Sequence, residues 1–192
     1  MFLETIKAVD GVVQHLRYHQ QRVDRTRLTC KDFPSFELDA LVKPPSQGIY
    51  RCRLLYGSDL PQVSYHPYLL RLPRSFKLVA SDTIDYAFKY SDRHALEALE
   101  TQKGEADTVL IVKKGMISDT PIANVAFFKK GRWYTPDSPL LEGTTRSRLI
   151  EENFLHVTRI TPEDLHRYDG MAVMNALTGF VEIQNGIMAI KK

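Results

Sequence analysis

The chain has 192 residues, of which 43% are hydrophobic, so it can bury a substantial core as one large domain or two small ones. Its 26 basic and 23 acidic residues give a net charge of +3, and the basic residues are too scattered for a nucleic-acid-binding arm. Two cysteines and six dispersed histidines show no metal-binding spacing, and no segment is typical of a membrane span or a signal peptide, so we expect a soluble cytoplasmic protein without a metal.

The N-terminal segment, residues 2–16, predicts two short strands around an Asp-Gly turn. A helix is expected to follow, because Leu16, His19 and Val23 recur at helical spacing and would share one face. This order of elements indicates a small α+β unit at the start of the chain.

A break rich in proline and glycine, residues 42–48, precedes two further predicted strands at 48–57 and 68–79. With these strands the first unit is complete. We therefore expect two domains, an N-terminal α+β domain over 1–84 and a C-terminal domain over 85–192.

The second domain is expected to begin with a helix that is capped by Ser91 or Asp92 and continues past Leu99. Two segments, 107–120 and 124–136, then each predict a strand, a Lys-Lys-Gly turn and a second strand. Antiparallel pairing is the expected arrangement within each segment.

The C-terminal part mixes helices and strands. Residues 142–154 predict a helix, and the Thr-Pro start of 161–168 is typical of a second, shorter one. Residues 171–190 predict two strands around a hairpin at Asn185 and Gly186.

Two features of the sequence could bind an anion. Gly143, Thr144 and Thr145 stand at a predicted helix start, where backbone N–H groups, hydroxyls and the helix dipole meet. Threonines in this position are more often simple caps. Arg22 could add a guanidinium to the same anion or be an ordinary surface arginine.

Two further residues could carry chemistry. Asp119, between a strand and a proline turn, could satisfy backbone donors or hold a cationic ring nitrogen. Lys89, which lies between Phe88 and Tyr90, could be a solvated lysine or an amine that attacks an aldehyde. An imine-forming lysine, an anion pocket and an acidic partner are together what pyridoxal phosphate requires, although the pattern alone does not bring them into one site.

The run from Phe88 to Arg146 resembles the class IV, D-amino acid aminotransferase-like, pyridoxal-phosphate enzymes, and among them the 4-amino-4-deoxychorismate lyases. The shared order is a lysine before a helix, "aDxvLi", a glycine turn, an acidic residue before "xxANxxF", "TP" and "L-x-G-x-x-R". The start, "FLETIKxxDG" followed by "HxxRV", is also similar to this family. The resemblance extends from Phe2 to about Ile183.

This resemblance implies an α+β fold of two small domains with pyridoxal 5'-phosphate at their interface, and it implies a homodimer. It makes Lys89 the lysine that binds the cofactor aldehyde and transfers protons, with a pKa lowered by its surroundings. It makes Asp119 the partner of the pyridine nitrogen, where most relatives have glutamate. The remaining cofactor contacts that it implies are with Arg22, Gly143, Thr144, Thr145 and, near the phenolic oxygen, Tyr65.

The activity that the resemblance implies is a lyase reaction of the folate pathway, from 4-amino-4-deoxychorismate to 4-aminobenzoate and pyruvate. Arg93, four residues after Lys89, is more similar to the lyases than to the transaminases. Two alternatives stay open. One is a class IV aminotransferase for branched-chain or D-amino acids, and the other is a cofactor-binding relative with little turnover.

Overall fold

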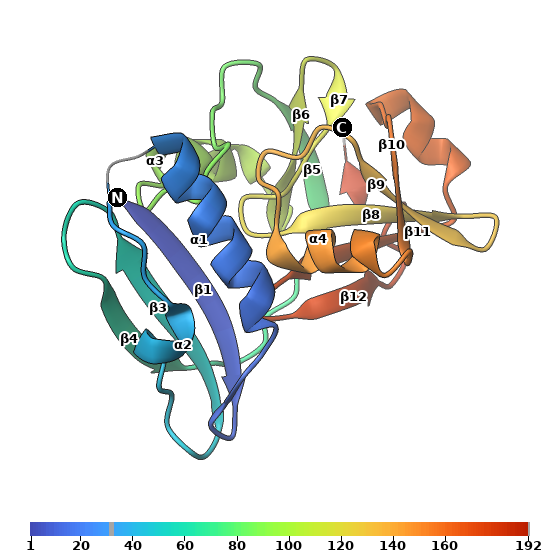
Figure 1. Cartoon of the computed structure of the whole chain (residues 1–192). Helices are drawn as coiled ribbons and strands as arrows, with labels where there is room; N and C mark the ends of the chain where they lie inside the picture. The colour runs from blue at the N-terminus through green and yellow to red at the C-terminus, as the bar shows by residue number, and fades with distance from the viewer. Residues whose placement is uncertain (31–32, 192) are drawn as a thin grey trace. The chain divides into compact units, whose positions relative to one another are not determined.

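The structure is a computed structural model that describes residues 1–30 and 33–191 of the chain (Figure 1). The chain forms two compact units. Unit 1 comprises Met1–Leu70 and Phe88–Asp92, and unit 2 comprises Arg71–Ala87 and Arg93–Lys192. The sequence predicts one boundary after residue 84, whereas the structure assigns the short segment around Lys89 to unit 1.

Unit 1 is an antiparallel sheet in the order β2-β1-β3-β4, with helix α1 along one face (Figure 1). Asp10 and Gly11, with φ of +47° and +81°, form the predicted two-residue turn between β1 and β2. The elements are β1 (Phe2–Val9), β2 (Val12–Val13), α1 (Leu16–Cys30), α2 (Leu38–Leu41), β3 (Ile49–Tyr56) and β4 (Gln62–Pro67).

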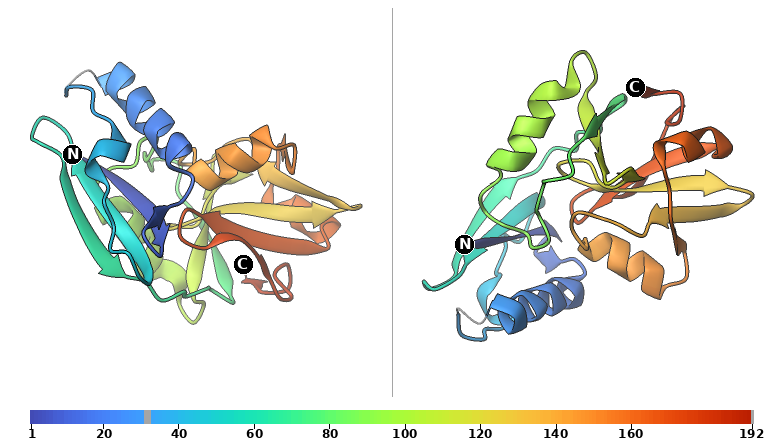
Figure 2. Two further views of the ribbon diagram at one scale, coloured as in Figure 1. Left: turned by 60° about the horizontal axis from the view of Figure 1, so that its bottom comes forward. Right: turned by 90° about the horizontal axis from the view of Figure 1, so that it is seen from above.

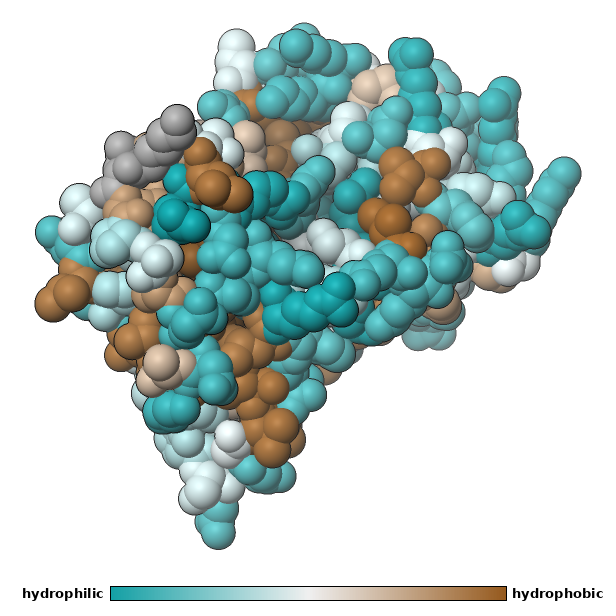
Figure 3. Space-filling view, viewed as in Figure 1, coloured by the Kyte–Doolittle hydropathy of each residue, from teal (hydrophilic) through white to brown (hydrophobic). Residues whose placement is uncertain are grey.

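The core of unit 1 lies under α1. Val23 of the helix packs in one hydrophobic cluster with Phe2, Ile6 and Ala8, which share one face of β1 because side chains alternate along a strand. The opposite side of α1 is hydrophilic in the space-filling view (Figure 3). This side carries the exposed Arg17, Gln21 and Arg25. The amphipathic pattern therefore turns the predicted face, with His19, toward the interior.

Unit 2 contains two sheets, with strand orders β10-β9-β8-β11-β12 and β13-β5-β6-β7. The parallel pairs β5–β6 and β9–β10 each have a helix between their strands in the chain, as a parallel connection requires. The strands are β5 (Phe76–Ala80), β6 (Thr108–Lys113), β7 (Met116–Ile117), β8 (Asn124–Lys129), β9 (Arg132–Pro136), β10 (Leu155–Thr158), β11 (Gly170–Asn175), β12 (Gly179–Ile183) and β13 (Ile190–Lys191). The helices are α3 (His94–Glu100), η1 (Thr101–Lys103), α4 (Thr144–Glu151) and η2 (Pro162–Arg167).

Successive residues of β8 and β11 alternate between two hydrophobic clusters. One cluster includes residues of β5 and β6, and the other includes Leu149 of α4, which lies along one face of this sheet (Figure 2). The residues on the β5–β6 side are Val125, Phe127, Met171 and Val173, and those on the α4 side are Ala126, Ala172 and Met174. This packing fixes the position of the loops at the ends of β8 and α4.

The two Lys-Lys-Gly hairpins are confirmed, with antiparallel pairing of β6 with β7 and of β8 with β9. The predicted hairpin at Asn185 and Gly186 is wrong. The chain turns instead between β11 and β12, where Oδ1 of Asn175 accepts hydrogen bonds from the N–H groups of Leu177 and Thr178. That local side-chain acceptor stabilises the earlier turn, and the last strand, β13, pairs with β5.

Three other elements differ from the prediction. The expected strand over 68–79 is shorter, since β5 begins at Phe76, and β4 forms from a segment without a predicted strand. The short helix after Thr161 is a 3₁₀ helix, and it does have the predicted capping box and first-position proline. Among the residues that the structure describes, no helix has the length and apolar content needed to cross a membrane.

Candidate active site

Lys89 lies in the segment of unit 1 that follows the first strand of unit 2. Its carbonyl accepts a hydrogen bond from Leu3 N–H at 2.9 Å, and Tyr90 forms a β-bridge with Phe2. The rings of Phe88 and Tyr90 pack on that of Phe2, at centroid distances of 6.2 and 5.6 Å. The two aromatic side chains thus anchor the segment to β1.

Arg22 is buried and held by a carboxylate, so it is not the surface arginine that spacing alone suggests. Its Nε donates to Oε1 of Glu4 at 2.7 Å, and its Nη2 donates to Oε2 at 2.6 Å. Nδ1 of His19 lies 2.6 Å from the same Oε2. Arg22 and His19 stand three residues apart on α1, so both side chains face β1, where Glu4 is completely buried.

The charges of this cluster favour an ionised Glu4. Burial alone would raise the pKa of Glu4, but the charge and hydrogen bonds of Arg22, with those of His19, lower it to about 2. Burial lowers the pKa of His19, and Glu4 opposes this shift. The positive charges of Arg22 and Lys89 also lower the pKa of His19, so both cations lie within electrostatic range of one imidazole. The structure therefore brings Arg22 and Lys89 into one region of unit 1.

Asp119 lies in unit 2, in the loop between β7 and β8. Thr120 closes this loop, because its N–H donates to the Ala123 carbonyl at 2.9 Å and its Oγ1 accepts from Ala123 N–H at 3.0 Å. The turn brings Asp119 and Asn124 together, with Nδ2 of Asn124 2.8 Å from Oδ1 of Asp119. Oδ2 of Asp119 accepts from Leu141 N–H at 3.1 Å.

Asp119 has a strongly shifted affinity for protons. Its side chain is buried, and burial raises its pKa to about 6 even though the hydrogen bonds from Asn124 and Leu141 and the charge of Arg146 oppose the shift. Arg146 is itself buried, and its Nη2 donates to the Pro136 carbonyl at 2.8 Å. A buried carboxyl of this kind is suited to a cationic partner, which would favour its ionised form.

Gly143, Thr144 and Thr145 form the predicted start of α4. Gly143 is the residue before the helix, and Thr144 and Thr145 are buried in its first turn. Gly143 has an ordinary φ of −69°, but a Cβ at this position would lie 2.0 Å from Oδ1 of Asn124. The glycine is therefore required by close packing and not by its backbone angle.

Tyr65 lies on β4 in unit 1, where its hydroxyl accepts a hydrogen bond from Lys43 N–H at 2.6 Å. The sequence-predicted residues thus form two sets. Arg22, Lys89 and Tyr65 belong to unit 1, and Asp119 belongs to unit 2 with residues 143–145.

The sequence interpretation missed Glu4, His19 and Asn124 as functional candidates. Each stood inside a quoted motif: Glu4 in "FLET", His19 in "HxxRV" and Asn124 in "xxAN". The signal that could have found them is polar character at positions of apolar periodicity, because a polar residue on a buried face needs a partner. Glu4 and His19 both occupy such positions.

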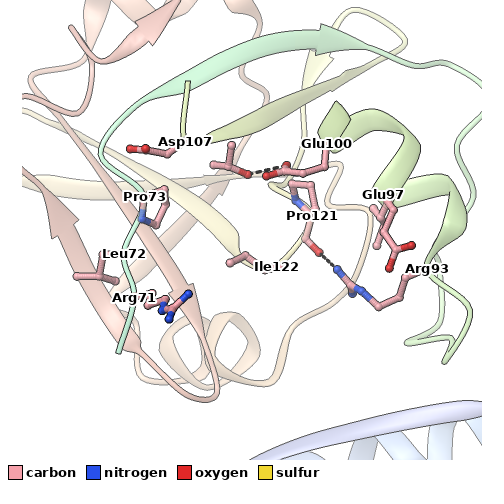
Figure 4. Close-up of a pocket in the computed structure, with 11 residues that line it drawn as sticks. Arg71, Leu72, Pro73, Arg93, Glu97, Glu100, Asp107, Pro121 and Ile122 are labelled. Atoms are coloured by element: carbon pink, nitrogen blue, oxygen red, sulfur yellow. Dashed lines mark hydrogen bonds between the residues drawn. The ribbon is translucent and has the colours of Figure 1, made fainter. Parts of the chain in front are cut away.

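A pocket of about 330 Å³ lies in unit 2 beside α3 (Figure 4). Arg93 points to the Pro121 carbonyl, to which its Nη2 donates at 2.9 Å, and Glu100 accepts from the Thr108 hydroxyl at 2.9 Å (Figure 4). Ile122 also lines this pocket. The pocket therefore contacts the loop that carries Asp119, but Asp119 and residues 143–145 are not among its lining residues.

The pKa of Asp119 predicts a specific pH dependence of stability. The pKa of Asp119 is about 6 in the folded protein, against an ordinary value of 3.8 for aspartate. Between these two pH values the folded protein binds a proton that the unfolded chain has lost, so the free energy of unfolding falls as pH rises from about 4 to about 6. We expect a loss of about 3 kcal/mol from this group. Urea unfolding of cofactor-free wild type and Asp119→Asn should be measured at pH 4 and at pH 7. The difference in free energy of unfolding between the two proteins should change between these pH values by this amount. A difference that is independent of pH would contradict the shifted pKa.

A family model described as "Amino-transferase class IV" matches residues 83–185, more than half of the chain. An uncharacterized protein of Haemophilus influenzae is 35% identical over 182 residues, which cover 92% of this chain and 97% of the relative. The chain belongs to the class IV aminotransferase family. This family comprises enzymes that depend on pyridoxal phosphate, so the predicted enzyme class and type of α+β fold are confirmed.

Two crystal structures illustrate the range of class IV relatives. One from Haemophilus somnus, provisionally named as a 4-amino-4-deoxychorismate lyase, is 34% identical with a TM-score of 0.87, covering 93% of this chain and 96% of that one. The branched-chain amino acid aminotransferase of Escherichia coli has a TM-score of 0.75 at 16% identity and covers 98% of this chain and 76% of that one. At this lower identity the similarity shows the fold alone.

The side chains of this class IV member fit the family's cofactor. Taken by itself, unit 1 has two cations, Arg22 and Lys89, near His19. Taken by itself, unit 2 has the buried carboxyl of Asp119, for which a cationic neighbour would favour the ionised form. Gly143 adds a position without a side chain before a helix. These groups are of the kinds that can bind an anionic phosphate, an aldehyde and a basic ring nitrogen, the three parts of pyridoxal phosphate.

Proposed function

We propose that this class IV enzyme is a pyridoxal-phosphate-dependent lyase that converts 4-amino-4-deoxychorismate to 4-aminobenzoate and pyruvate, a reaction of the folate pathway. The observation that carries the proposal is the 34% identity, over nearly the whole of both chains, to the Haemophilus somnus protein provisionally named as such a lyase. The same order of site motifs in the present sequence supports it.

In this proposal Lys89 binds the cofactor covalently and, once released, carries the proton of the substrate α-carbon. Lys89 and Arg22 both lie within electrostatic range of His19, so the two cations that this proposal needs occur in the same part of unit 1. Arg22 would bind the phosphate, because Glu4 holds its guanidinium in a fixed orientation. Tyr65 would contact the phenolic oxygen.

The residues of unit 2 would bind the other groups of the cofactor. Asp119 would keep a proton on the ring nitrogen, and Gly143, Thr144 and Thr145 would bind the phosphate with backbone N–H groups and hydroxyls. When bound, pyridoxal phosphate supplies an electron sink for the electron pair left at the substrate α-carbon. Departure of pyruvate then leaves an aromatic ring, which makes the reaction favourable.

The test separates a lyase from a transaminase by the need for a second substrate. With 4-amino-4-deoxychorismate alone, generated in situ, a lyase should release pyruvate and 4-aminobenzoate together over many enzyme equivalents, because elimination requires no amino acceptor. A transaminase would stop after one equivalent until a keto acid is added. Both products should be measured against the rate without enzyme.

The second candidate function is a class IV aminotransferase for branched-chain or D-amino acids, favoured by the match to the family model described as "Amino-transferase class IV". Conversion of D-alanine, glutamate or a branched-chain amino acid that depends on a keto acid, without pyruvate release, would establish this alternative. A protein that binds the cofactor and turns over neither kind of substrate would support the remaining alternative, a cofactor-binding relative with little turnover. A homodimer in the cytoplasm stays a prediction from the family resemblance.

A further inference from the structure

The side chain of Asn124, at the start of β8, connects two parts of unit 2 that are distant in sequence. Its Nδ2 donates to Oδ1 of Asp119 at 2.8 Å and to the Leu141 carbonyl at 2.8 Å. Both partners are acceptors, so the amide can have only one orientation, with nitrogen toward them. Leu141 N–H in turn donates to Oδ2 of Asp119 at 3.1 Å, which closes a ring of three residues.

The oxygen of the same amide faces the start of α4. A Cβ on Gly143 would lie 2.0 Å from Oδ1 of Asn124, well below any real contact. Leu141 precedes Gly143 by two residues. The amide is therefore fixed on one side by Asp119 and on the other by the segment that leads into the helix.

We propose that Asn124 is a positioning residue that couples the carboxylate for the ring nitrogen to the backbone that binds the phosphate. The inference rests on the proposed function, since it takes Asp119 and the start of α4 as contacts of the two ends of one cofactor. One buried side chain then sets the distance between both contacts. Such coupling matters more for an aspartate than for a glutamate, because the shorter side chain has fewer rotamers with which to reach a ring.

The first measurement needs no cofactor. In cofactor-free protein, the carboxyl carbon of Asp119, followed by carbon-13 NMR, should titrate near pH 6 in the wild type. In Asn124→Ala its proton affinity should rise about tenfold, because a hydrogen bond to the ionised form is lost. Gly143→Ala should produce the same direction of shift, since its methyl group displaces the amide without removing it.

Asn175→Ala is the matched control. Its Nδ2 contacts the same loop at the Ile122 carbonyl, at 3.2 Å, yet Asp119 has no hydrogen bond to it. We expect wild-type titration of Asp119 in this variant. If Asn124→Ala does not fold, the proposal is tested by the titration of Asp119 in Gly143→Ala alone. A titration equal to that of the wild type in each folded variant of Asn124 and Gly143 would overturn the proposal.

The second measurement is the equilibrium Kd for pyridoxal phosphate. It should rise about tenfold in Asn124→Ala and in Gly143→Ala and stay unchanged in Asn175→Ala, because only the first two loosen both cofactor contacts. Wild-type protein that binds cofactor, with unchanged Kd in both variants, would overturn the coupling alone. Wild-type protein that binds no pyridoxal phosphate would overturn the proposed function and the coupling together.

Discussion

Lys89→Ala should abolish covalent binding of pyridoxal phosphate and lower turnover by about 10²- to 10⁴-fold, the usual contribution of a group that transfers a proton in the reaction. The fold should persist, because Leu3 N–H bonds to the backbone carbonyl of Lys89 and the neighbouring rings pack independently of its side chain. Wild-type protein should be yellow, and borohydride should fix the cofactor to one lysine. Peptide mapping identifies that lysine.

Lys77→Ala is the control, since Lys77 lies on β5 and has no predicted role. This variant should retain the colour, the borohydride adduct and the activity. An adduct on Lys77, Lys113 or another lysine of the wild type would show that the assignment of Lys89 is wrong. A colourless wild type that cannot be reconstituted with cofactor would contradict the proposed function itself.

Glu4→Gln should destabilise the protein by about 3–5 kcal/mol, the usual effect of removing one charge from a buried ion pair. Glu4 is completely buried and accepts two hydrogen bonds from Arg22, so glutamine keeps the shape of the side chain but offers one oxygen and one nitrogen to two donors. Urea unfolding monitored by circular dichroism at pH 7 measures the difference. We also expect weaker cofactor binding, because the orientation of Arg22 is lost.

Glu152→Gln is the matched control for Glu4. Glu152 also accepts from an arginine, Arg148, at 2.9 Å, but its side chain is 49% exposed, and such pairs contribute about 0–1 kcal/mol. A loss of stability in Glu4→Gln no larger than in Glu152→Gln would contradict the structural role of the buried cluster.

The same carboxylate predicts acid sensitivity. The pKa of Glu4 is about 2 in the folded protein, against an ordinary value of 4.5 for glutamate. The folded state therefore binds fewer protons than the unfolded state between these two pH values, and the contribution of Glu4 to the free energy of unfolding is complete above pH 4.5. We expect about 3 kcal/mol to be lost as pH falls from 4.5 toward 2, and Glu4→Gln should lack this component.

Much of the fold follows from local patterns. The Asp-Gly turn, the amphipathic face of α1 and the two Lys-Lys-Gly hairpins each depend on residues that are near one another in sequence. The errors arise where local signals compete. Asn185 and Gly186 suit a hairpin, but the acceptor on Asn175 stabilises a turn ten residues earlier, and pairing with β5 takes the last strand.

The candidate site divides in the same way. The sequence by itself determined the family, because the order of its motifs along the chain matches that of the family. With the family it also determined Lys89, Arg22 and Asp119 as candidates. Only the tertiary structure decided that Glu4 holds Arg22 and His19, and that Asn124 holds Asp119. These contacts join residues of separate elements or opposite ends of a turn, and their strength comes from exclusion of water in the folded core. Burial is a property of the packed chain, so the pKa of about 6 for Asp119 and of about 2 for Glu4 exist only after folding.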